Sequence, residues 1–173
     1  GATPNQGLVK WAGAGHESGS VGRRSIQTVA FSGYSGTLSL SGSQAVRAVF
    51  YETHGDAQVL QVGELGKPAC GPEQVLVEVA AAGVNPIDRR LRAGELTEYI
   101  QRTFPVVPGF DVSGRIAEVG AVVTDWQVGD EIMGLAFTWS IQHGTYAEFA
   151  PVDAAAIAPK PANASFVQAA GIP

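Results

Sequence analysis

Short apolar runs, most of them followed by glycine or proline, succeed one another through this sequence after residue 45, and few folds accommodate such a pattern. The chain holds 22 glycines and 10 prolines among 173 residues. Glycine and proline end helices and favour turns, so this punctuation favours short strands over long helices. Short strands with turn signals about every 8–12 residues are typical of a small β-barrel or sandwich. We therefore expect a mainly β fold with only short helices.

The strands are predicted where the runs alternate or are rich in β-branched side chains. Their expected ranges are 46–51, 59–62, 74–82, 111–119, 131–135, 144–150 and 155–158. Residues 95–104 are polar, and the pattern leaves open whether they form a loop or one or two helical turns. Pro105 and Pro108 then require an extended segment. Residues 80–134 are the centre of this pattern, and we expect the rest of the domain to form a barrel wall around them.

Two short helices are predicted. Asn85 can cap the first and Pro86 suits its first position, so this helix is expected over residues 86–92. The second is expected within residues 162–170, where Gln168 can complete a capping box. Its candidate caps are Asn163 and Ser165.

Residues 1–45 differ in composition from residues 46–173, which we expect to form the folded domain. Residues 1–46 hold nine Gly and eight Ser and have little apolar periodicity. They carry three basic residues and one acidic residue, whereas the chain as a whole has a net charge of −5. The charged residues are Lys10, Glu17, Arg23 and Arg24. We interpret this extension first as a docking or interface segment, and otherwise as a retained organelle leader or an expression remnant.

Composition also excludes several classes of function. The negative net charge argues against nucleic acid as a partner. The single cysteine, Cys70, excludes an intrachain disulfide and a cysteine-rich zinc lobe, and nothing nearby lowers the pKa of its thiol, so no nucleophile is predicted. No run of apolar residues is long enough to predict a membrane span. No GxGxxG motif follows a strand, so the sequence carries no dinucleotide-binding fingerprint.

Four motifs resemble a known family. They are GVNPIDRRLRAG at 83–94, PVVPGFDVSGRIAEVG at 105–120, VGDEIMGL at 128–135 and GTYAEFAPV at 144–152. In this order they resemble the GroES-like domain of the medium-chain dehydrogenase/reductase superfamily, and within it the zinc-free quinone oxidoreductase (zeta-crystallin-like) branch. The resemblance covers residues 46–173 and implies a partly open β-barrel. It also implies a Rossmann cofactor domain after the AAGIP segment, and this sequence does not contain one.

The resemblance further implies that the domain binds no metal. Zinc enzymes of this superfamily place a cysteine at the position of Asn85 and a His-Glu pair at the positions of Phe110 and Asp111. Zinc requires a fixed set of Cys, His or carboxylate ligands, and Asn85 and Phe110 do not supply them.

The family pattern N-P-x-D-x-x-x-R-x-G matches at Asn85, Asp88 and Arg92, which are therefore the candidate cofactor-binding residues. The resemblance implies that they form one wall of a cleft on the nicotinamide side, and no catalytic residue is assigned. Simpler alternatives remain open: Asn85 as a helix cap, and the basic helix residues as a solvated face, paired with Asp88 or attracting a phosphate. Tyr146 is expected to be a core aromatic residue, and His54 and His143 to lie on the surface.

Enzymes of this family transfer hydride from NADPH to a quinone, an enone or an enoyl thioester. Because one wall of a cleft cannot position both reactants, we expect this chain to bind no cofactor and to be inactive alone. It is then the barrel part of such an oxidoreductase, or else an accessory subunit of a larger complex. Protein partners are expected at the extension and at an apolar edge near Phe166, Val167 and Ile172. The expected compartment is intracellular, and the basic leader admits a mitochondrion or another organelle.

Overall fold

The computed structural model describes residues 8–9 and 44–173, so most of the predicted extension lies outside the described residues. The strands are β1 (Leu8–Val9), β2 (Ala45–Phe50), β3 (Gln61–Gly66), β4 (Gln74–Gly83), β5 (Gln101–Val107), β6 (Asp111–Val119), β7 (Glu131–Leu135), β8 (Ser140–His143), β9 (Phe149–Asp153) and β10 (Ile157–Pro159). The helices are α1 (Pro86–Ala93) and α2 (Phe166–Ala169), with 3₁₀ turns at Ala57–Val59 and Ala154–Ala156. The predicted mainly β fold with short helices is confirmed.

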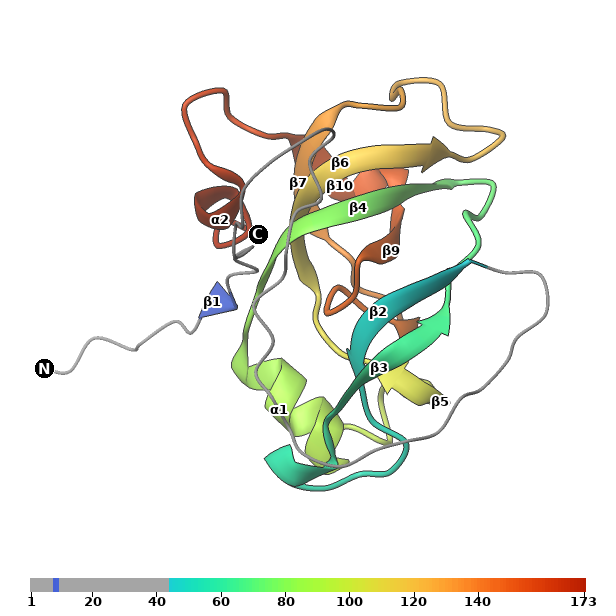
Figure 1. Cartoon of the computed structure of the whole chain (residues 1–173), viewed down its shortest axis with the longest axis vertical. Coiled ribbons are helices and arrows are strands. Elements are labelled where there is room, and N and C mark those ends of the chain that lie inside the picture. Colours follow the sequence, from blue (N-terminus) through green and yellow to red (C-terminus); the bar gives the residue numbers. More distant parts are fainter. Residues whose placement is uncertain (1–7, 10–43) are drawn as a thin grey trace, which may run out of the picture.

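The longest strand, β4, is the centre of the main sheet (Figure 1). It pairs antiparallel with β6 along its length, and β6 continues the sheet through β7 to β10. The other edge of β4 pairs with β9 over its first half and with β1 at its end. The β2–β3 hairpin and the parallel pair β5–β8 complete the partly open barrel, joined by the bridges Ala48–Ala147 and Tyr51–Val106.

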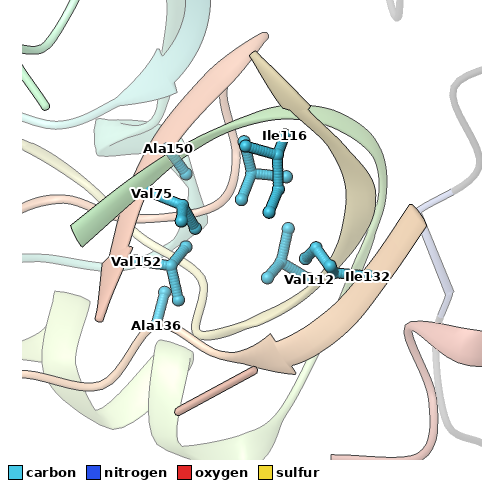
Figure 2. Close-up of a cluster of buried hydrophobic side chains, with 8 residues drawn as sticks. Val75, Val112, Ile116, Ile132, Ala136, Ala150 and Val152 are labelled. Carbon is cyan, nitrogen blue, oxygen red and sulfur yellow. The ribbon is translucent and has the colours of Figure 1, made fainter. Parts of the chain in front are cut away.

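The main core lies inside the curve of this sheet (Figure 2). Alternation along β4 directs Val75 and Val77 into it, and both are fully buried. The buried members of this cluster are Val75, Val77, Val112, Ile116, Ile132, Ala136, Ala150 and Val152. They are mainly β-branched residues and alanines, which fill a space between closely paired strands without long side chains.

A second core cluster lies under α1, which begins where β4 ends (Figure 1). Leu91 of α1 is fully buried there, and Ile87, one turn earlier, is partly buried against the same cluster. The buried members are Tyr51, Leu91, Ile100, Val106, Phe110 and Ile141. Gly94 ends the helix in the left-handed conformation at φ 85°, as its position predicts. This packing fixes the start of α1 beside the turn that leads into β6.

The structure corrects several predicted strand boundaries. Strand β3 begins later than expected, because Asp56 accepts a hydrogen bond from the Gln58 amide at 2.9 Å and caps a 3₁₀ turn. The strand expected over 144–150 begins at Phe149, because the amides of Thr145 and Tyr146 bond instead to the Pro108–Gly109 turn. The last strand also begins later than expected, after a second 3₁₀ turn.

Three strands were missed, and the second helix is shorter than expected. The predictions did not include β1, which lies in the extension and pairs with the end of β4. They also included neither β5 nor β8, which pair in parallel with each other. Helix α2 spans only Phe166–Ala169, and Ser165 is its cap. Ser165 and Gln168 exchange the two hydrogen bonds of the predicted capping box.

Candidate functional site

The site begins at the junction of β4 and α1. Asn85 has an extended backbone at φ −122° and ψ 157°, and Pro86 takes the first helical position. Asp88, in the first turn, accepts a hydrogen bond from the Asn85 backbone N–H at 2.7 Å through Oδ2. Its side chain turns back into the protein, and the residue is only 5% exposed. The short helix is thus anchored at its start by a buried carboxylate.

Tyr146 reaches the same carboxylate from the segment before β9. Its phenol donates to Asp88 Oδ2 at 2.9 Å. Its ring packs against the cluster of Ala48, Phe50, Val107 and Ala147, which confirms the predicted core role. Burial, and then the charge of Asp88, raises the pKa of the Tyr146 phenol far above its ordinary value. The phenol therefore stays protonated and acts as a donor.

Asp111, the first residue of β6, contacts Asn85 from another direction. The Asn85 Nδ2 donates to Asp111 Oδ2 at 2.6 Å. Asp111 is also 5% exposed, whereas Asn85 is partly exposed. Gly109, two residues before Asp111, has a φ of 95°, and a Cβ there would collide with Thr145 and Tyr146, so glycine lets that segment pack against the turn. Asn85 is therefore held through its backbone by Asp88 and through its side chain by Asp111.

Both carboxylates lie in a poorly solvated region. Burial raises the pKa of Asp88, while the hydrogen bonds from Asn85 and Tyr146 oppose that rise. Burial likewise raises the pKa of Asp111, against the bond from Asn85. Asp88 Oδ1 is buried without a hydrogen-bond partner among the described residues. The cluster is thus acidic. The groups that donate hydrogen bonds to its carboxylates are neutral and not cationic.

The third candidate, Arg92, does not bond to this cluster. Its Nε donates to the Gly55 carbonyl at 3.3 Å, and its own carbonyl accepts from the Gly55 amide at 3.1 Å. Arg92 therefore ties α1 to the loop after β2. The structure brings Asn85 and Asp88 together and adds Asp111 and Tyr146.

The other basic residues of α1 lie on its exposed face. Arg89 and Arg90 form ion pairs with Glu95 at 3.0 and 3.2 Å, so their partner is not Asp88 as we had considered. His54 is partly buried, with its ring 5.3 Å from that of Phe104, and His143 is exposed.

Sequence reasoning missed Asp111 and Tyr146 as members of the site. Asp111 follows the Pro108–Gly109 turn, at a position that the family resemblance already connects with Asn85. This connection between the two positions could have identified Asp111 as a neighbour of Asn85. Tyr146 lies 58 residues from Asp88, and nothing in the local pattern connects the two.

Within residues 8–9 and 44–173, no three His, Cys, Asp or Glu side chains gather in a way that would hold a metal ion. The positions of the family's zinc ligands hold the Asn85 amide, the buried ring of Phe110 and the Asp111 carboxylate. No described helix combines the length and the apolar character needed to cross a membrane.

Two surface hollows of about 520 and 410 Å³ adjoin Trp126 and Ala154. Neither is lined by Asn85, Asp88 or Asp111, so they are separate from the candidate site.

Residues 71–162 match the model of the alcohol dehydrogenase GroES-like domain family. The chain belongs to this family. The predicted resemblance to quinone oxidoreductases is also confirmed, since the similar proteins include quinone oxidoreductases and alkenal reductases of the medium-chain dehydrogenase/reductase superfamily.

Among curated relatives, the chloroplastic NADPH-dependent alkenal/one oxidoreductase of Arabidopsis thaliana is 34% identical over 142 residues, covering 79% of this chain and 36% of that protein. The quinone oxidoreductase of Mus musculus is 35% identical over 136 residues, with coverages of 77% and 39%. Among solved structures, the quinone oxidoreductase of Coxiella burnetii superimposes with a TM-score of 0.67 at 30% identity, covering 75% of this chain and 41% of that one. The chain thus spans 36% to 41% of the length of these three proteins.

Proposed function

We propose that residues 46–173 are the barrel domain of an NADPH-dependent reductase of alkenals, enones or quinones, and that Asn85 lies on its reactive face. One observation carries the proposal. The partly exposed Asn85 is fixed by two buried carboxylates, through its backbone at 2.7 Å and its side chain at 2.6 Å. An amide held so firmly is pre-organised for a ligand, because little conformational freedom remains to be lost on binding.

The chemistry of Asn85 fits the nicotinamide ring. Beyond its bond to Asp111, its amide retains a carbonyl oxygen, which can accept a hydrogen bond from the N–H of a carboxamide. When bound, NADPH supplies the hydride. This domain would orient the ring through Asn85, while Asp88 and Tyr146 keep Asn85 in place. We propose that the nucleotide phosphates are held elsewhere, by residues outside this sequence or by a second chain.

A domain graft tests the proposal. Residues 46–173 replace the matching part of the Arabidopsis alkenal/one oxidoreductase, and NADPH oxidation is followed with an alkenal and with a quinone. We expect turnover with at least one acceptor. Asn85→Leu should reduce it by about ten- to a hundredfold, because an orienting group is lost. Asn163→Leu is the matched control, since Asn163 is exposed in the loop before α2, and it should leave turnover unchanged.

The graft also needs evidence that both of its domains are folded. Nucleotide fluorescence reports NADPH binding, and a cooperative unfolding transition reports the barrel. A folded graft that binds NADPH but reduces neither acceptor would overturn the proposal.

One relative favours a second function, that of a protein-binding accessory subunit in an organelle. The mitochondrial reticulon-4-interacting protein 1 of Caenorhabditis elegans is 37% identical over 114 residues, and its name records a protein partner. The exposed apolar residue at the expected docking edge is Ile172, at 55%, since Phe166 is partly covered by Arg115 and Lys160. A folded graft without turnover, together with a stable complex of the 173-residue chain and a partner protein, would favour this second function.

A further inference from the structure

We propose that Asp111 is a positioning residue that sets the polarity of the Asn85 amide, so that Asn85 offers its carbonyl oxygen to a ligand bearing an N–H or O–H donor. The inference rests on the proposed function, because it assumes that the exposed edge of Asn85 meets a ligand. It adds the device that orients this edge and the kind of ligand group that suits it.

The first step is the chemistry of the contact. An asparagine side chain can turn by half a rotation and exchange its donor and acceptor ends at almost no steric cost. The Asn85 Nδ2 donates to Asp111 Oδ2 at 2.6 Å, and in its ionised form this carboxylate can only accept hydrogen bonds, so the contact of the ionised form is attractive only when Nδ2 faces it. The opposite orientation would place two oxygen acceptors against each other. Asp111 therefore turns Asn85 Oδ1 away from itself.

The second step is the rigidity of Asp111. A Cβ built on Gly83 would lie 2.8 Å from Asp111 Oδ2 and 2.8 Å from the carbonyl oxygen of Ala170. The carboxylate is thus confined beside the bare backbone of Gly83 and the end of α2. Ser113, two residues along the same strand, bonds to the Phe166 carbonyl at 2.5 Å and holds α2 against β6. Asp111 has little room in which to follow a movement of Asn85.

The third step is the anchoring of the Asn85 backbone. Asp88 Oδ2 accepts its N–H, and Tyr146 donates to that same oxygen. With the backbone held by Asp88 and the Nδ2 end held by Asp111, the orientation of Asn85 Oδ1 is determined. Titratable groups that influence this cluster also include Arg92, whose charge acts on the Tyr146 phenol together with those of Asp88 and Asp111.

These contacts point to a class of ligand group. An outward carbonyl oxygen accepts a hydrogen bond from a primary carboxamide or a hydroxyl group. A quinone or enone carbonyl has no hydrogen to donate, so it cannot bond to this oxygen. The polarity therefore suits the carboxamide of a nicotinamide better than the carbonyl of the acceptor substrate.

The first test uses nuclear magnetic resonance of the 173-residue chain itself. We expect one Asn85 Nδ2 proton to be shifted downfield and to exchange with solvent at least tenfold more slowly than a free asparagine amide. Asp111→Ala should abolish both effects. Asp153→Asn, at a distant 3₁₀ cap, should change neither. An Asn85 amide that behaves as a free one in the wild-type chain would overturn the inference, whatever the graft shows.

The second test exchanges the two residues in the domain graft. Asn85→Asp alone places two carboxylates in contact and should raise the Kd for NADPH more than tenfold. The double variant Asn85→Asp with Asp111→Asn restores a donor facing a carboxylate and still presents an oxygen acceptor outward. It should recover NADPH binding to within about threefold of the parent graft. Failure to recover, in a double variant that unfolds like the parent, would show that the ligand needs the Asn85 N–H and would overturn the proposed polarity.

The two proposals fail in different ways. Loss of the proposed function appears as a folded parent graft without turnover. Loss of the present inference appears in the Asn85 resonances, or in the exchanged pair of a graft that is itself active.

Discussion

Tyr146 donates a hydrogen bond of 2.9 Å to Asp88, a residue 58 positions earlier in the chain. The bond joins the segment before β9 to the first turn of α1. Because Asp88 also accepts the Asn85 N–H, one carboxylate oxygen couples the long-range packing of the barrel to the residue at the centre of the candidate site. The stability of this region and the geometry of Asn85 should therefore change together.

Removing the two ends of this bond should have unequal effects. Tyr146→Phe keeps the ring in the core and loses one hydrogen bond, so we expect the free energy of unfolding to fall by about 1–2 kcal/mol. Asp88→Ala leaves the Asn85 N–H and the Tyr146 phenol without their acceptor, and should cost about 3–5 kcal/mol. Urea unfolding of the purified chain measures both. Equal losses would show that Asp88 does not serve two donors.

The pH dependence of stability should reveal the two buried carboxyl groups. The pKa values of Asp88 and Asp111 are raised above the ordinary 3.8, so the native state binds their protons more tightly than the unfolded state does. The stability that they contribute is complete below the unfolded pKa and is lost as pH rises through their folded pKa values.

Asp88→Asn should therefore become more stable relative to the wild type as pH rises through that window. Urea unfolding from about pH 3 to pH 8 measures the difference. Hydrogen bonds to Arg90 and Lys160 lower the pKa values of Glu95 and Glu131, so these two residues contribute to the pH dependence of stability with the opposite sign. Both proteins contain them, so their contributions cancel in the comparison. A difference that stays constant with pH would contradict the raised pKa of Asp88.

Local patterns predicted the parts of the fold that are held by local interactions. The alternation in β4, the Pro86 start and Gly94 end of α1, and the Ser165 cap of α2 each depend on neighbours in sequence, and all were found. The pair β5–β8 was missed because its strands meet in parallel across an intervening 32 residues, from Val107 to Ser140. Strand β5 is also mostly exposed or half-buried in its first five residues, so it lacks the alternation that marks a strand.

The candidate site was predicted only in part, for a related reason. Asn85 and Asp88 lie in one short motif, and their proximity follows from a single helical turn. Asp111 and Tyr146 come from distant parts of the chain and meet Asn85 and Asp88 through the tertiary fold of the barrel. Arg92 belongs to the same motif and lies one helical turn after Asp88, but its side chain bonds to the Gly55 carbonyl and not to the cluster.

Lys160 should control how firmly the C-terminal helix is held. Its side chain is 7% exposed, and its Nζ lies 3.0 Å from Glu131, 2.7 Å from the Ala164 carbonyl and 5.3 Å from the Phe166 ring centroid. Lys160→Met keeps the apolar stem but loses these polar contacts. We expect the Ala170 amide, which bonds to the Phe166 carbonyl, to exchange with deuterium roughly tenfold faster.

Lys67→Met is the matched control for that experiment. Lys67 pairs with Glu118 at 2.6 Å, but the Glu118 side chain is 48% exposed, and such surface pairs contribute little. Exchange at Ala170 should be unchanged in this variant. If both lysine variants accelerate exchange equally, the effect is a general loss of stability and not the release of α2.

Two glycine-to-alanine substitutions should separate close packing of strands from backbone strain. A Cβ at Gly114 of β6 would collide with the Glu78 carbonyl of the neighbouring strand, and neither backbone can withdraw without breaking the β4–β6 pairing. A Cβ at Gly129 would meet nothing within 4 Å, and the only obstacle there is its φ of 97°. Gly129→Ala should therefore cost about 1–2 kcal/mol, whereas Gly114→Ala should cost more than about 3 kcal/mol or prevent folding. Urea unfolding, with circular dichroism at low denaturant to detect a chain that does not fold, distinguishes the two. A Gly114→Ala protein as stable as Gly129→Ala would mean that β4 and β6 can separate at this point, and that the centre of the barrel is less tightly paired than its hydrogen-bond register implies.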